Sequence, residues 1–209
     1  MLYDLDMTIK ALLQSELPPE LLGPAINVFI GFATPDDRFP PANFQLPALN
    51  LFLYDIQENA SLRNPQEYLE KQNDVPVLVR RPPFWVDCHY MVTAHARDGS
   101  LVPEADEHLL LGEALRVLLR HRRIPSECFQ GHLQGQVFLP RTSVVRPESL
   151  RHGMDLWNAL RGRSRPSFHY TVSLAFEVTA PQQVGPLVAE KGSQLRLHQR
   201  KEGVATTEE

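Results

Sequence analysis

Hydrophobic and polar residues alternate along some stretches of the chain and repeat at helical spacing along others. The alternating stretches predict strands at 25–32, 48–56, 84–96 and 168–178, with a short further strand at 136–139. The helical spacing predicts helices at 5–17 and 104–120, and a third helix that opens at Pro147 and includes Leu160. Helices segregated on a mostly antiparallel sheet make this an α+β domain.

The strand predicted at 48–56 has an unusual pattern. Leucines at 49, 51 and 53 alternate with Asn50, Phe52 and Tyr54, so apolar side chains lie on both faces. The strand runs straight into a polar, proline-bounded arm at 57–83 instead of a tight turn. A connection longer than about 12–15 residues without strong structure is usually functional or disordered, so we expect this arm to have a role of its own.

The strand predicted at 84–96 has one apolar face and one mixed face. The apolar face carries Val86, Cys88, Tyr90, Val92 and Ala94, and the other carries Trp85, Asp87, His89, Met91, Thr93 and His95. We interpret the mixed face as a solvated sheet surface.

The alternative is a small hydrolase or metal enzyme that uses Asp87, His89 and His95. His89 and His95 lie about 20 Å apart along a strand, too far to share one metal. The sequence has no H-E-x-x-H, G-x-S-x-G or Walker-type motif. We therefore identify no catalytic site and no metal site from these residues.

Composition is that of an ordinary soluble protein. The chain has 209 residues, of which 43% are hydrophobic and 22% charged, with a formal net charge of −4. That charge gives no general attraction to nucleic acid, and no apolar run approaches the roughly 20 residues of a membrane span. Cys88 and Cys128 form no CxxC motif, which fits a reducing cytoplasm and leaves their pairing open. We predict a single domain over 1–180 and a polar, flexible tail over 181–209.

Charge is distributed unevenly along the chain. Residues 1–60 contain eight acidic and two basic residues, whereas residues 141–200 contain nine basic and four acidic residues. Such a chain can present acidic and basic surfaces that meet between copies, or it can pair these charges internally. Arg161, Arg163 and Arg165, with Arg151, could bind phosphate or nucleic acid, but we interpret them as a solvated helix end. No aromatic residues interleave them, which disfavours binding of single-stranded nucleic acid.

Several local patterns occur together in a familiar order. They are "TPDD", "ALNLFLYDIQENASLRN", "RRPPFWVDCHYMVTAHA", "EHLLLGEALRVLL" and "LWNALRGRSRPSFHYTVSLAFEV". Over residues 3–180 the chain thus resembles the tube-cap or tail-terminator family of contractile injection systems, the phage-tail-like particles of the virulence-cassette and antifeeding-prophage type.

The resemblance implies a phage tail-terminator-like fold and a structural role. A homo-hexameric ring would cap the inner tube and contact the last sheath ring, with the inner tube protein and the sheath protein as partners. The resemblance also implies that the protein is not an enzyme and has no cofactor and no nucleic-acid substrate. We expect the protein in the bacterial cytoplasm during assembly and then in the particle. A non-catalytic assembly chaperone or binding module of the same apparatus stays an alternative.

In this setting, the arm at 57–83 is expected to be mobile in the monomer and ordered by a neighbouring subunit or by the tube. Trp157 and Tyr170 lie on apolar faces of their elements, so we expect both to be buried structural residues and not binding residues. The candidate subunit-interface residues are Tyr54, Asp55, Glu58, Asn59, Arg63, Arg161, Arg163 and Arg165.

Overall fold

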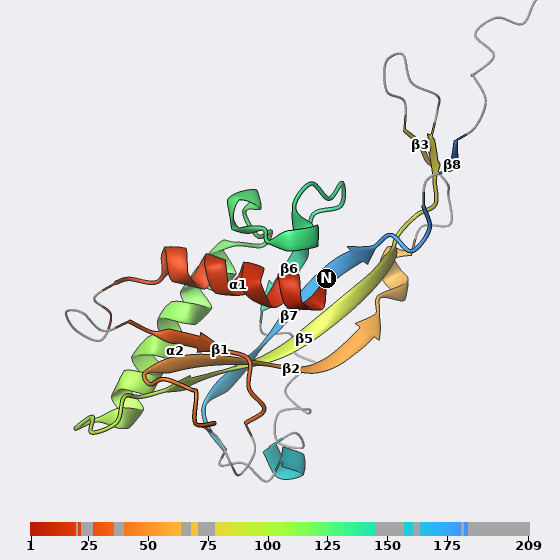
Figure 1. Ribbon diagram of the computed structural model, residues 1–209. Helices are drawn as coiled ribbons and strands as arrows, with labels where there is room; N and C mark the ends of the chain where they lie inside the picture. The colour runs from red at the N-terminus through yellow and green to blue at the C-terminus, as the bar shows by residue number, and fades with distance from the viewer. Residues whose placement is uncertain are drawn as a thin grey trace, which may run out of the picture.

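The fold is built around one mixed five-stranded sheet (Figure 1). The computed structural model describes residues 1–19, 21, 27–35, 40–63, 68–70, 78–144, 157–160, 164–180 and 182–183. The main sheet has the order β1-β2-β5-β7-β6, with β1 at Phe29–Gly31, β2 at Ala48–Glu58, β5 at Phe84–His95, β7 at Ser167–Phe176 and β6 at Arg141–Val144. All neighbouring pairs are antiparallel except β1 and β2. The predicted α+β class with a mostly antiparallel sheet is confirmed.

Two long helices accompany the sheet, α1 at Leu2–Glu16 and α2 at Pro103–Arg120. Short 3₁₀ turns lie at Ala60–Leu62 (η1), Ser126–Cys128 (η2) and Gly131–Leu133 (η3). Within the described residues, no helix is long and apolar enough to cross a membrane.

Three predicted elements differ from the structure. Residues 136–139 are not a strand, because Pro140 interrupts the run and the strand β6 forms only after it, where it pairs with Tyr170–Ser173 of β7. The strand predicted at 25–32 is shorter, since β1 spans only Phe29–Gly31 and residues 22–26 lie outside the described residues. Of the third predicted helix, residues 157–160 are helical and 147–156 lie outside the described residues.

The hydrophobic core lies between the two helices and one face of the sheet. Tyr90 of β5 and Tyr170 of β7 are fully buried at its centre, under Leu5, Ile9 and other apolar residues of α1. Trp157 is also buried, at 6% exposure. The predicted burial of Trp157 and Tyr170 is confirmed.

The spacing of apolar residues in α2 predicts a buried face of Leu111, Leu115, Leu118 and Leu119 with Ala114. In the structure Ala114 and Leu118 are buried, and Leu111 and Leu115 are partly buried and pack against the same core. The prediction differs at Leu119, which is 54% exposed, and it missed the buried Leu110 and Val117.

The second face of the sheet was predicted to be solvated, and this is also wrong. Asp87, Thr93 and His95 of β5 are buried there, as are His169, Thr171 and Ser173 of β7. Phe44, from the connection before β2, packs edge-on against His95 with ring centroids 6.4 Å apart. The alternation of apolar and polar residues along one strand cannot show that a connection from elsewhere in the chain covers its polar face.

The predicted arm contains regular structure. β3 at Tyr68–Glu70 and β4 at Leu78–Arg80 pair antiparallel, and β8 at Gln182–Gln183, from the predicted tail, adds to β4. Figure 1 shows β3 and β8 at the upper right, beyond the ends of β2, β5 and β7. The segments 64–67 and 71–77 lie outside the described residues.

Candidate subunit-contact site

Five of the predicted interface residues gather where β2 ends. The register between β2 and β5 shifts between Leu53 and Asp55, which places a β-bulge at Tyr54. Before the bulge Leu53 pairs with Tyr90, and after it Ile56 pairs with Cys88. The extra residue reverses the alternation, so Ile56 joins Leu53 on the core face and Tyr54 lies on the opposite face, beside two histidines. Leu53 and Ile56 therefore share the core face although three positions separate them.

Tyr54 packs between two histidine rings. Its hydroxyl lies 2.9 Å from Nδ1 of His169, and its ring centroid lies 5.3 Å from that of His169 and 6.1 Å from that of His89. Burial, followed by the neighbouring Asp55 carboxylate, raises the pKa of Tyr54 above its ordinary value. Tyr54 is therefore half-buried, with its polar end already bound within its own chain.

Asn59 joins the end of β2 to the centre of the sheet. Its Nδ2 donates to both carboxylate oxygens of Asp87, at 3.1 and 3.0 Å, and its Oδ1 accepts from the backbone N–H of Leu62. Its own N–H donates to the carbonyl of Trp85 at 2.8 Å. This residue caps η1 and joins the start of the arm to β5.

The charged residues of the site are Asp55, which is partly buried, and the exposed Glu58 and Arg63. Arg63 pairs with Glu58 at 2.5 Å, and both side chains are largely exposed. Asp55 accepts from the N–H of Ile56 and from Nε2 of Gln57 at 2.6 Å. An exposed ion pair contributes little to stability, so Arg63 can exchange Glu58 for another partner at small cost.

Arg165 lies elsewhere in the molecule. Its guanidinium pairs with Glu107 of α2, which also accepts from the N–H of Ala96 just after β5. Glu58 pairs with Val86, near the start of β5, whereas Ala96 follows the end of β5. The two positions lie roughly 30 Å apart along the strand. The structure thus does not bring Arg165 together with the β2 residues, and Arg161 and Arg163 lie outside the described residues.

The alternative enzyme site is not assembled either. Asp87 accepts from Asn59 and from the hydroxyl of Ser173, His89 Nδ1 lies 2.9 Å from Thr171 Oγ1, and His95 Nε2 lies 3.1 Å from Thr93 Oγ1. Burial, with Arg165 as the lesser cause, lowers the pKa of His95 to about 4. No group of three or more potential metal ligands occurs among the described residues.

The cysteines offer no nucleophile. Cys88 and Cys128 are both unpaired and buried, which answers the question that the sequence left open. Burial raises the pKa of the Cys88 thiol to about 12, and nearby Asp87 adds to the shift. At neutral pH this thiol is protonated and therefore unreactive.

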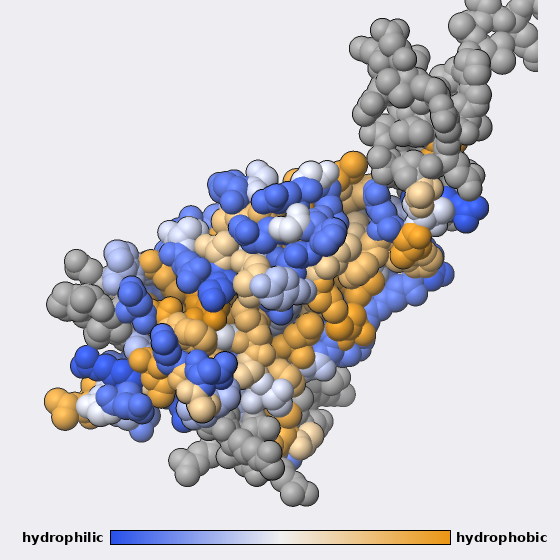
Figure 2. Space-filling model, in the orientation of Figure 1, coloured by the Kyte–Doolittle hydropathy of each residue, from blue (hydrophilic) through white to orange (hydrophobic). Residues whose placement is uncertain are grey.

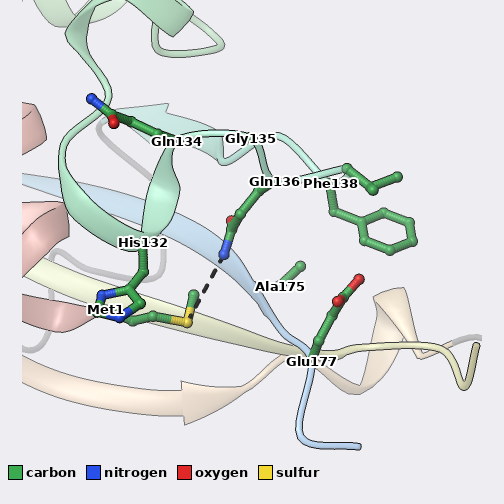
Figure 3. A pocket seen from close by; sticks show the side chains of 9 residues that line it. Met1, His132, Gln134, Gly135, Gln136, Phe138, Ala175 and Glu177 are labelled. Carbon is green, nitrogen blue, oxygen red and sulfur yellow. Dashed lines mark hydrogen bonds between the residues drawn. The ribbon is translucent and has the colours of Figure 1, made fainter. Parts of the chain in front are cut away.

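A hollow of about 300 Å³ lies beside the last residues of β7 (Figure 3). Met1, Gln136, Phe138 and Glu177 are among its lining residues, and Gln136 Nε2 lies 3.9 Å from the sulfur of Met1. His132, at its edge, is bound to Asp4 at 2.9 Å. The side chains around it form no nucleophile–base pair, so it is a surface recess with no evident chemistry.

The chain matches a known family over nearly its whole length. Residues 4–190 match the sequence model of the Pvc16 N-terminal domain. The chain belongs to this family. The match reaches beyond residue 180 and includes β8, which the resemblance in the sequence did not cover. No curated protein matches the chain.

Two solved structures share the family's fold. One is the sheath/tube terminator of PVC, an extracellular contractile injection system, in the extended state; it is 20% identical, with a TM-score of 0.58 over 95% of this chain. The other is the tube-terminating cap of the anti-feeding prophage, 18% identical, with a TM-score of 0.59 over 92% of this chain. The chain spans 64% and 61% of these two proteins, which is less than two thirds of each. The predicted tail-terminator-like fold is confirmed.

Proposed function

We propose that the chain is a structural cap protein that terminates the inner tube of a contractile injection system. Copies of it form a homo-hexameric ring on the last tube ring and contact the last sheath ring. The protein acts without cofactor, metal or nucleic acid. It is present in the bacterial cytoplasm during assembly and remains in the finished particle.

The observation that carries this proposal is the family match over residues 4–190. Two structures of similar fold are described as a sheath/tube terminator and a tube-terminating cap. The arrangement of side chains supports a structural role as well, because Asp87, His89 and His95 each bind a neighbour in the sheet and do not converge on a common point.

The proposal is tested by removing the protein from a cell that assembles the particle. Electron microscopy should then show tubes of uncontrolled length, and supplying the intact chain should restore uniform length and a cap at the end distal to the baseplate. If the restored particles have uniform length but lack this protein, it is an assembly chaperone. Uniform particles in its absence would contradict both roles.

The arm provides a second test. Replacing residues 60–74 by a few glycines removes β3 and η1, which has no buried residue, and leaves β5 and β7 intact. We expect nearly unchanged folding stability but lost capping, because the arm contacts a neighbouring subunit or the tube. An unfolded variant, or normal capping without the arm, would refute this role.

A further inference from the structure

Two arginines lie directly opposite one another beside the last strand of the main sheet. Arg123, from the connection between α2 and β6, forms an antiparallel bridge with Arg141, the first residue of β6. Residues paired in this way point to the same face, with their Cβ atoms about 4.5–5.5 Å apart. Arg141 pairs in turn with Ser173 of β7, and Ser173 with the buried Asp87 of β5, so both arginines lie on the second face of the sheet. We call Arg123 and Arg141 the arginine pair.

The positive charge of the arginine pair is not compensated within the described part of the chain. Both side chains are exposed, and neither forms an ion pair with any residue that the structure describes. Like charges directly opposite one another destabilise a sheet, so the arginine pair lowers the stability of the isolated subunit. The same arrangement becomes favourable once an anion from outside the chain lies between the two guanidinium groups.

An aromatic ring holds the guanidinium of Arg141 in place. Its Cζ lies 5.1 Å from the ring centroid of Trp85, and Trp85 is buried and packs edge-on against Phe138 with centroids 6.1 Å apart. Stacking on the indole restricts the guanidinium plane while its N–H groups stay available as donors. Because its orientation is already fixed, Arg141 binds a carboxylate through two parallel hydrogen bonds at a smaller entropic cost than a mobile arginine.

Arg141 also borders a hollow of about 340 Å³ between η1 and β6. The residues that line this hollow are Asn59, Ser61, Leu62, Arg141, Thr142 and Ser173. Asn59 and Ser173 both donate to the carboxylate of Asp87, so that charge is already bound within the sheet. The exposed Ser61 offers a hydroxyl donor, and Leu62 offers an apolar wall. The hollow therefore suits a side chain with a short apolar stem and an anionic end.

The charge of the arginine pair selects the chemistry of its ligand. Apolar side chains are exposed on the core side, at the end of the sheet beyond α1 (Figure 2), but an apolar surface does not distinguish one partner from another. A carboxylate fits the arginine pair better than a phosphate group with two charges, because the buried carboxylate of Asp87 repels the second charge more strongly. The formal net charge of −4 adds no general attraction for nucleic acid. The favoured ligand is thus an aspartate or glutamate side chain of another protein.

We propose that the arginine pair and the adjoining hollow bind an acidic segment of a partner protein. One carboxylate of that segment lies between Arg123 and Arg141, its stem lies against Leu62, and the hydroxyl of Ser61 donates a further hydrogen bond. The binding site itself stands on the geometry of these residues. That it holds a neighbour of the cap in the assembled particle rests on the proposed function, and it gives the chemistry of one contact that the cap makes.

Binding is tested in the purified chain with a fluorescein-labelled peptide that has an Asp-Glu pair between glycines. Fluorescence anisotropy at low salt should show binding, and Arg123→Gln or Arg141→Gln should weaken it about tenfold or more, because each removes charge-assisted hydrogen bonds. Arg122→Gln is the matched control, since it removes the same charge from an exposed neighbour outside the bridge and should bind like the wild type. Arg123→Gln should also keep or raise the melting temperature because it removes the like-charge contact, whereas a structural arginine would lower it when replaced.

The site is then examined in assembled particles with the photocrosslinker p-benzoylphenylalanine in place of Ser61. Mass spectrometry should find the crosslink in an acidic segment of another protein. No peptide binding by the wild type, equal binding by Arg141→Gln, or stronger binding of a single-stranded DNA oligonucleotide of equal charge would overturn the proposal. Capped particles whose crosslinks contain no acidic segment would overturn it too and leave the cap function intact. Arginine-dependent peptide binding by a chain that is absent from tube ends would support the site and refute the cap function.

Discussion

Gly31, at the end of β1, is packed directly against Phe44. A Cβ atom added to Gly31 would lie 2.1 Å from Cε2 and 2.7 Å from Cζ of Phe44. The ring is held between Phe29, with centroids 4.9 Å apart, and His95. Phe44 cannot move away without losing these contacts, so Gly31→Ala should destabilise the protein by about 1–3 kcal/mol through overpacking.

The magnitude is measured with a double-mutant cycle. Gly31→Ala, Phe44→Ala and the double variant are compared with the wild type by urea and thermal unfolding, where 1 kcal/mol corresponds to roughly 2–4 °C in a protein of this size. In the Phe44→Ala background the clash is gone, so Gly31→Ala should be nearly neutral there. The interaction energy should reach about 1 kcal/mol or more.

A matched control uses Gly112, which among the described glycines shares with Gly31 a backbone that other residues adopt without strain. Gly112→Ala fills open space in the middle of α2, so it should stabilise the protein by about 0.5–1 kcal/mol. If Gly31→Ala is equally stabilising, or if its effect simply adds to that of Phe44→Ala, the close contact and the reasoning from it are refuted.

Three further predictions concern buried groups. Trp157→Ala and Tyr170→Ala should each cost about 3–5 kcal/mol, seen as lower melting temperatures; a variant that melts normally but no longer assembles would show a contact role instead. The free energy of unfolding should fall as the pH is lowered from about 7 toward 4, because His95 gains a proton near its ordinary pKa in the unfolded chain while burial holds its pKa at about 4 in the folded protein. His95→Gln should flatten this pH dependence, and an unchanged slope would contradict the lowered pKa of His95. Cys88 and Cys128 should react with a thiol reagent only after unfolding, so rapid labelling of the native protein would contradict their burial.

The regular elements were largely predictable from the sequence because their patterns are long. The 18 residues of α2 and the 12 residues of β5 each begin and end within one residue of the prediction. Proline and glycine signals on either side mark their ends clearly. Short elements were less predictable, as β6 shows, because a four-residue strand is defined by its partner more than by its own sequence.

The candidate site was predicted only in part. The residues from Tyr54 to Arg63 do lie together, since they are neighbours in the chain, but Arg165 belongs to the other end of the sheet. The position of Ile56 on the core face was missed because the one-residue bulge at Tyr54 reverses which side chains of β2 face the core. The missing information is the register of β2 against β5, which tertiary contacts determine.

The order of strands in the main sheet has a consequence for how the protein folds on the ribosome. The central strand β5 pairs on one side with β2, which is made earlier, and on the other with β7, which ends at Phe176. Synthesis adds about 5–20 residues per second, so β5 waits several seconds for its second partner. During that time one edge of β5 is unpaired, and such edges are prone to join other chains. A nascent chain released before Phe176 would therefore aggregate, whereas truncation after residue 183 leaves the main sheet complete.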